Sequence, residues 1–101
     1  MDGIDELRRR IDAIDAELVR LLNERSACAL AIGRLKEHAG LPIYQPAREA
    51  EVLSRVRAEN PGPLDAGAVT RLFERIIDEA RRLERLAASG EKDGRRSGGQ
   101  R

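Results

Sequence analysis

The fold is decided by residues 4–36, which read IDELRRRIDAIDAELVRLLNERSACALAIGRLK. Apolar side chains recur there every three or four residues, except for a gap at position 25, at Ile4, Leu7, Ile11, Ile14, Leu18, Leu21, Cys28, Ile32 and Leu35. This spacing predicts a single amphipathic helix with a heptad-like apolar seam. Gly40 and Pro42 then supply a stop signal. About 35 residues make a helix of roughly 50 Å.

The predicted helix is too long for a chain of this size. A compact domain of 101 residues has a radius of gyration of about 13 Å, so this helix must extend beyond its own domain. Shorter helices cannot cover its whole apolar stripe. We therefore expect the same helix of a second copy to cover the stripe in a homodimer.

Two further helices are expected after the long one. A short helix is predicted from Pro46 through Val56, because proline suits the first turn of a helix. Residues 60–63 read NPGP and break it. Asp65 is placed to cap a third helix of medium length, which we expect to end near Ala88.

Residues 89–101 contain mainly glycine, serine and charged side chains without apolar periodicity. We therefore predict a helical domain over residues 1–88, followed by a disordered polar tail over residues 89–101. No strand-like alternation and no glycine-rich phosphate loop appears in the sequence. The expected fold class is all-α, with one long, one short and one medium helix.

Composition argues against several classes of function. The formal net charge is +1 and only 2% of residues are aromatic, whereas nucleic-acid binding favours a basic stripe with stacking side chains. No apolar run suits a signal peptide or a membrane span, so we expect a cytoplasmic protein without a membrane or nucleic-acid partner. Cys28 is expected to be a buried small hydrophobe, and His38 has no partner at metal-ligand spacing, so no metal is expected.

A cation interrupts the apolar seam of the long helix at Arg25. Lys36 follows it by eleven residues, which returns to within roughly 20° of the same face, so both cations point one way. Arg8 lies about 100° round the helix from Arg25 and some 25 Å away. It cannot join the other two cations within one chain, but it could join those of a neighbouring copy.

The third helix carries an acid at the edge of its apolar stripe. Glu84 follows Ile77 by seven residues and Ala80 by four. A carboxylate in that position is costly unless it is paired, hydrogen-bonded or protonated.

Each of these charged residues, taken singly, also has an ordinary structural explanation. Arg25 could extend from a dimer seam or pair with a structural glutamate, and Glu84 could be a solvated helix end. Arg48 and Glu49, in the first turn of the second helix, could form a surface pair. Arg8 stands in a run of three arginines that is typical of a solvated face.

From Leu7 to Leu86 the chain resembles the all-helical, class II chorismate mutases. The motifs that carry the resemblance are residues 7–8 (LR), 11–15 (IDAID), 21–25 (LLNER), 32–36 (IGRLK), 46–53 (PAREAEVL) and 72–77 (LFERII). The resemblance implies an intertwined homodimer with two equivalent sites and no cofactor. It also implies conversion of chorismate into prephenate, in phenylalanine and tyrosine biosynthesis.

The resemblance assigns roles to the charged residues. Arg25, Arg48 and the partner subunit's Arg8 would bind the two carboxylates of the substrate. Lys36 would contact a carboxylate and the ether oxygen, and Glu84 would lie on the far side of that oxygen. Lys36, Glu84 and Arg48 are thus the expected catalytic residues.

Three further positions would complete the substrate site. Glu49 would accept a hydrogen bond from the ring hydroxyl of the substrate. Gln45 stands where members of the family often have aspartate, Ala80 where serine is frequent, and Glu84 where glutamine is frequent. Gln45 and Ala80 are therefore expected to line the substrate with fewer polar contacts.

Two other functions remain open at this point. Isochorismate-pyruvate lyases resemble the same scaffold and eliminate pyruvate through a related pericyclic step. A non-catalytic helical dimer, acting as a scaffold or binding a metabolite as a regulatory domain, would also have this architecture.

Overall fold

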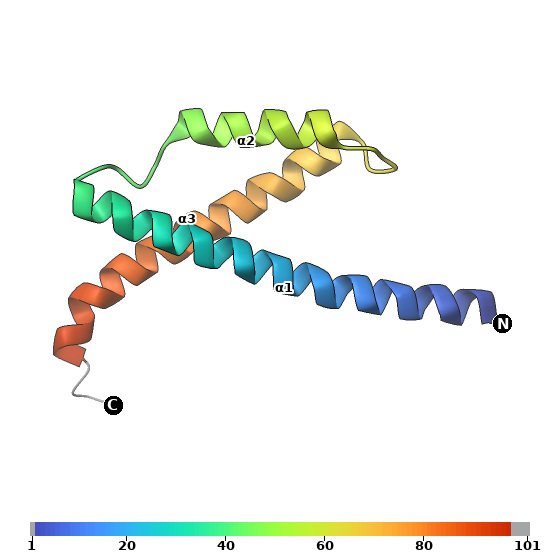
Figure 1. Cartoon of the computed structure of the whole chain (residues 1–101), viewed down its shortest axis with the longest axis horizontal. Coiled ribbons are helices and arrows are strands. Elements are labelled where there is room, and N and C mark those ends of the chain that lie inside the picture. The colour runs from blue at the N-terminus through green and yellow to red at the C-terminus, as the bar shows by residue number, and fades with distance from the viewer. Residues whose placement is uncertain (1, 98–101) are drawn as a thin grey trace.

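The computed structural model describes the backbone of residues 2–97 and the side chains of residues 3–90. The described chain consists of three helices and no strand (Figure 1). These are α1 (Asp2–Ala39), α2 (Pro46–Glu59) and α3 (Ala66–Ser97). The predicted all-α class and the three helices are confirmed.

The end of α1 is fixed by Gly40, which has a φ of +73°. Its N–H donates to the carbonyl of Glu37 at 3.2 Å, and the N–H of Leu41 donates to the carbonyl of Lys36 at 2.7 Å. These two bonds form a Schellman motif, in which glycine is favoured at the left-handed position. The predicted stop is confirmed, and it directs the chain into the loop before α2.

The starts of α2 and α3 also follow the sequence. Pro46 occupies the first turn of α2. The N–H of Ala68 donates to Oδ1 of Asp65 at 2.7 Å, which satisfies one of the free donors at the start of α3. Between α2 and α3, Nδ2 of Asn60 donates to the carbonyl of Leu64 at 2.7 Å. This bond stabilises the turn after which α3 crosses the molecule.

The length of α3 corrects the sequence prediction. The helix continues to Ser97 instead of ending near Ala88, so the backbone of residues 89–97 is helical. No proline interrupts this segment, and Glu91, Lys92 and Arg95 have high helix propensity. The remainder of the predicted tail, residues 98–101, lies outside the described residues.

The other two helices rest on α3. It packs against both α1 and α2, whereas the described parts of α1 and α2 make no backbone contact with each other. Figure 1 shows α3 crossing α1 obliquely beneath α2, while the N-terminal half of α1 extends away from both. Side chains of all three helices can therefore face one another only near the C-terminal half of α1.

A single chain buries very little apolar surface. Among the described residues, only Val52, Val69 and Ala80 are buried hydrophobic side chains. The radius of gyration is 17.9 Å, against about 13 Å for a compact domain of this length. Cys28 is exposed, contrary to prediction.

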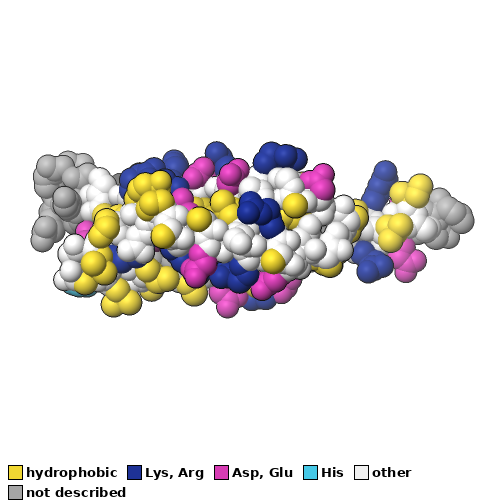
Figure 2. All heavy atoms as spheres, turned by 90° about the horizontal axis from the view of Figure 1, so that it is seen from above, with side chains coloured by type: hydrophobic (Ala, Val, Ile, Leu, Met, Phe, Trp, Pro, Cys, Tyr) yellow, Lys and Arg dark blue, Asp and Glu magenta, His cyan; other side chains and the backbone are white. Residues whose placement is uncertain are grey.

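The apolar seam of α1 lies open along its whole N-terminal half. Figure 2 shows solvent-exposed hydrophobic side chains over the region where the three helices pack and on the N-terminal half of α1, which projects to the right. The seam residues there are between 46% and 59% exposed: Ile4, Leu7, Ile11, Ile14, Leu18 and Leu21. A continuous apolar stripe of this length is typical of a protein–protein interface.

Candidate active site

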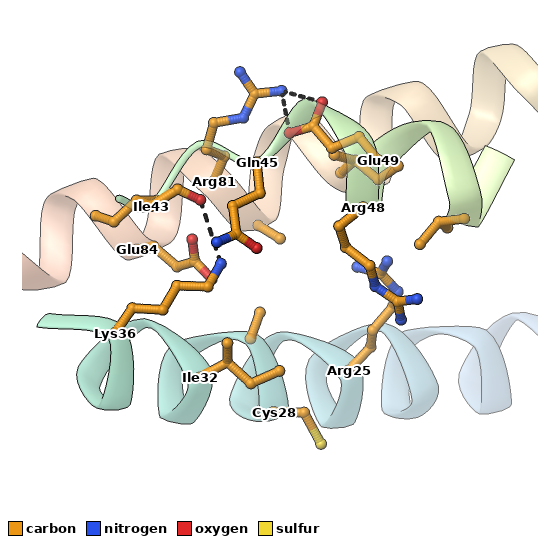
Figure 3. Close-up of a pocket in the computed structure, with 14 residues that line it drawn as sticks. Arg25, Cys28, Ile32, Lys36, Ile43, Gln45, Arg48, Glu49, Arg81 and Glu84 are labelled. Atoms are coloured by element: carbon orange, nitrogen blue, oxygen red, sulfur yellow. Dashed lines mark hydrogen bonds and ion pairs between the residues drawn. The ribbon is translucent and has the colours of Figure 1, made fainter. Parts of the chain in front are cut away.

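A cavity of about 420 Å³ lies where α1 and α2 face each other over α3 (Figure 3). Its size is within the range of pockets that bind small molecules. The cavity is lined by nearly all the site residues that the sequence suggests, namely Arg25, Lys36, Gln45, Arg48, Glu49, Ala80 and Glu84. Arg8 does not line it, as helix geometry predicts for a single chain.

Cations enter the cavity from two opposite sides. Arg25 and Lys36 come from α1, and both side chains are half-buried. In Figure 3, Arg25 rises from α1 and Arg48 descends from α2 into the space between the helices. Arg25 forms no ion pair with any described residue, which is not the arrangement of a structural salt bridge. Two guanidinium groups that converge in this way suit the binding of an anion.

Arg48 and Glu49 do not form the surface pair that their sequence positions allow. Nη1 of Arg48 instead donates to Oε1 of Glu51 at 2.7 Å, between two exposed side chains. Such an exposed pair contributes little to stability, so it leaves Arg48 free to exchange Glu51 for a ligand. Glu49 points to the other side of α2, toward α3.

Lys36 and Glu84 lie near one another at one end of the cavity. Nζ of Lys36 donates to the carbonyl of Ile43 at 3.4 Å, which holds the ammonium group beneath the loop before α2. Burial raises the pKa of Glu84, and the positive charges of Lys36 and Arg81 oppose this rise without cancelling it. The Glu84 carboxyl therefore keeps its proton to a higher pH than an exposed glutamate does, and the protonated form can donate a hydrogen bond.

Gln45 and Ala80 contribute to the cavity in different ways. Gln45 precedes α2, where its side chain makes no capping hydrogen bond and lies beside Lys36 in Figure 3. Its backbone carbonyl accepts from the N–H groups of Arg48 and Glu49, at 3.1 and 3.2 Å. Ala80 is 8% exposed and offers only a methyl group.

Arg81 is a cavity residue that the sequence analysis does not single out. It lies on the same face of α3 as Ile77 and Glu84, at spacings of four and three residues, and this periodicity is the signal that could have identified it. Its Nη2 is 2.9 Å from Oε2 and 3.0 Å from Oε1 of Glu49. Its guanidinium carbon lies 4.8 Å from the centre of the Tyr44 ring.

The charges around the cavity are unbalanced. Four cations line it, Arg25, Lys36, Arg48 and Arg81, against the two acids Glu49 and Glu84. Two positive charges therefore remain when both acids are ionised. This excess of positive charge favours a small anionic ligand, and the arginine side chains supply the geometry that carboxylates prefer.

Neither a metal centre nor a membrane span is present in the part of the chain that the structure describes. No group of three or more His, Cys, Asp and Glu side chains is arranged there to hold a metal ion. None of the described helices has the length and apolar character needed to cross a membrane.

Comparison with known proteins finds relatives that match most of the chain. A family model described as chorismate mutase type II matches residues 7–85. The bifunctional chorismate mutase/prephenate dehydratase of Neisseria gonorrhoeae is 48% identical over 86 residues, which cover 81% of this chain and 23% of that protein. The chain spans about a quarter of the length of the bifunctional relatives that it matches.

Two solved structures share the fold. Form II of the chorismate mutase from Thermus thermophilus has a TM-score of 0.81 and 41% identity, covering 82% of this chain and 94% of that one. The Helicobacter pylori chorismate mutase, solved in complex with prephenate, has a TM-score of 0.80 and 31% identity, covering 88% of this chain and 97% of that one.

Proposed function

This chain belongs to the chorismate mutase type II family, and from that premise we propose that it converts chorismate into prephenate. One observation carries the proposal. The cavity gathers three cations and two acids from three different helices, at the positions that the family resemblance selects. A relative that binds prephenate on the same fold supports this choice of ligand.

The reaction explains why a site of this kind needs cations. Chorismate rearranges by breaking an ether C–O bond and forming a C–C bond within one molecule, so no nucleophile is required. The catalyst has to fold a flexible dianion into a reactive chair. Arg25 and Arg48, which enter the cavity from opposite helices, would hold the carboxylates and bring the two reacting carbons together.

Lys36 and Glu84 would stabilise the charge that develops during the reaction. Negative charge grows on the ether oxygen as its bond to carbon breaks, and one well-placed donor there is worth about 2.7 to 4 kcal/mol. Lys36 is the stronger donor because it is cationic. Glu84 can add a second hydrogen bond only while protonated, and its raised pKa favours that form.

The other lining residues would position the rest of the substrate. Glu49 would accept a hydrogen bond from the ring hydroxyl, while Gln45 and Ala80 would close the cavity around the ligand. Ala80 brings no hydrogen-bonding group, so the affinity contributed from this wall would come from packing alone.

We also propose that the active form is a homodimer in which the partner subunit's Arg8 completes the site. The exposed seam of α1 and the small core of the single chain support a second copy as the covering element. Arg8 is exposed on the N-terminal half of α1, which extends away from its own cavity. An arginine placed in this way could reach only a neighbour's site.

The test is incubation of the purified protein with chorismate, followed by loss of substrate absorbance and identification of the product. Prephenate as the product supports the proposal. Isochorismate is incubated in parallel, because release of salicylate and pyruvate would assign the chain to the lyases instead. Turnover of neither compound by a folded dimer would favour a non-catalytic binding domain.

A further inference from the structure

We propose that Arg81 is a positioning residue, which holds Glu49 for the substrate and keeps it away from the cations that bind the substrate carboxylates. This inference rests on the proposed function and extends it to a residue of α3 that has no role in the reaction described above. Three observations carry it: the contacts of Arg81, its fixed orientation, and the other cations that line the same cavity as Glu49.

Arg81 and Glu49 form a connection between α3 and α2. One nitrogen, Nη2, lies 2.9 and 3.0 Å from the two carboxylate oxygens, and both side chains are only about one quarter exposed, at 26% and 25%. Hydrogen bonds between charged groups are strong and directional when water is largely excluded. The carboxylate of Glu49 therefore has a defined orientation before any ligand enters.

The guanidinium of Arg81 is itself held from other directions. Tyr44 lies against its face at 4.8 Å, and Asp78 accepts a second bond from Nη2 at 3.1 Å. Its Nε is buried and has no hydrogen-bond partner among the described residues. An unpaired buried donor lowers the stability of the fold. The orientation of the Arg81 guanidinium is therefore not the one that would maximise stability.

Glu49 has competing partners within the same cavity. Arg25, Lys36 and Arg48 all line it and would bind the substrate in the proposed function. A glutamate released from Arg81 could pair with one of them and neutralise a charge that the substrate needs. By holding Glu49 on the α3 side, Arg81 keeps those cations available and presents the remaining lone pairs of the carboxylate to the ligand.

The kinetic test separates positioning from direct participation. Arg81→Gln should raise KM about tenfold with kcat changed less than about twofold, because the lost contacts act equally on bound substrate and transition state. In the Glu49→Gln background the same substitution should have little further effect, since the competing carboxylate is gone. Arg81→Lys should restore part of the affinity, because it keeps the charge but loses the planar contact with Tyr44.

Arg82→Gln is the matched control. Arg82 is the next residue of α3, is 64% exposed and pairs only with Glu79, at 3.7 Å, among the described residues. Its substitution should leave both constants unchanged. If Arg81→Gln is poorly folded, Tyr44→Leu provides a milder variant, which frees the guanidinium and should raise KM by a smaller factor that also disappears in the Glu49→Gln background.

An independent readout does not need turnover. The guanidinium signals of Arg81 in ¹⁵N-resolved spectra should show a restrained side chain, which becomes mobile in Glu49→Gln. A wild-type protein that does not convert chorismate would end the proposed function while leaving this restraint measurable. The inference on Arg81 is overturned if Arg81→Gln leaves KM unchanged. It is also overturned if Arg81→Gln raises KM by the same factor in the Glu49→Gln background as in the wild type.

Discussion

Gly33 of α1 lies directly against Glu84 of α3. A Cβ atom added to Gly33 would be 3.3 Å from Cγ and 3.5 Å from Cδ of Glu84. Gly33 is buried, unlike the other described residues of α1, so the two helices make their close approach at this point. The backbone of α1 therefore sets how far the Glu84 carboxyl extends into the cavity.

Gly33→Ala should reduce activity without unfolding the protein. The added methyl group displaces the flexible Glu84 side chain by a few tenths of an ångström, which moves a donor whose position matters for the reaction. We expect kcat to fall about fivefold to tenfold. Alanine also raises helix propensity by up to about 1 kcal/mol, so the melting temperature should not drop.

Gly90→Ala is the control for this prediction. Gly90 is also helical, and a Cβ there meets no atom within 4 Å. It should gain stability and keep full activity. Equal activity of the Gly33 and Gly90 variants would show that the close approach does not control Glu84.

Activity should decrease toward alkaline pH because of Glu84. Burial raises the pKa of this carboxyl above its ordinary value of 4.5. The protonated form donates to the ether oxygen, whereas the ionised form would repel the developing charge. The value of kcat/KM should therefore be constant below the raised pKa and fall as pH rises through it. Glu84→Gln donates at every pH, so its profile should be flat; the same alkaline fall in that variant would assign the titration to another group.

The same pKa shift predicts the pH dependence of stability. The folded state holds the Glu84 proton more tightly than the unfolded state, because its pKa is raised on folding. Above about pH 4.5 the unfolded state therefore binds fewer protons than the folded state. The free energy of unfolding falls as pH rises from there through the raised pKa. Urea unfolding at several pH values should show this fall in the wild type and not in Glu84→Gln. Parallel curves for the two proteins would contradict it.

Arg25→Leu should separate catalysis from stability. Arg25 is half-buried without an ion-pair partner among the described residues, so a hydrophobic replacement should leave the free energy of unfolding unchanged or increase it. Turnover should nevertheless fall about 100-fold or more in kcat/KM, because a substrate carboxylate loses its charged partner.

Arg20→Leu is the comparison for Arg25→Leu. Arg20 lies on the same helix, is 58% exposed and pairs with Glu17 and Glu24 on its own face. Its loss should have little effect on kcat/KM. A similar decrease for both substitutions would indicate a general effect on α1 and not a specific contact with substrate.

The parts of the site that the sequence predicts are those fixed by one helix. Arg25 and Lys36 share a face because rotation per residue is constant within α1, and Arg8 is placed away from them by the same geometry. The relation of Arg48 and Glu49 to that face follows from the family resemblance. No local rule determines how α2 lies over α1.

The residues that sequence reasoning misses depend on tertiary contacts. Arg81 forms its key pair with Glu49, which is 32 positions away along the chain, while its neighbours Asp78 and Arg82 give the surrounding sequence the character of a solvated face. The end of α3 is missed for another reason. Apolar periodicity reports which face is buried, and a helix can continue to Ser97 after its buried face has ended.

Mixing two inactive variants should restore activity if the site is shared between subunits. Arg8→Ala homodimers would lack Arg8 in both sites, and Lys36→Ala homodimers would lack Lys36 in both. In a heterodimer, the cavity of the Arg8→Ala chain keeps its own Lys36 and receives an intact Arg8 from its partner. Random reassociation of equal amounts should therefore recover about one quarter of the wild-type activity, with half of the dimers mixed and one intact site in each. Mixtures that stay inactive, although mass spectrometry detects heterodimers, would show that Arg8 does not act across the interface.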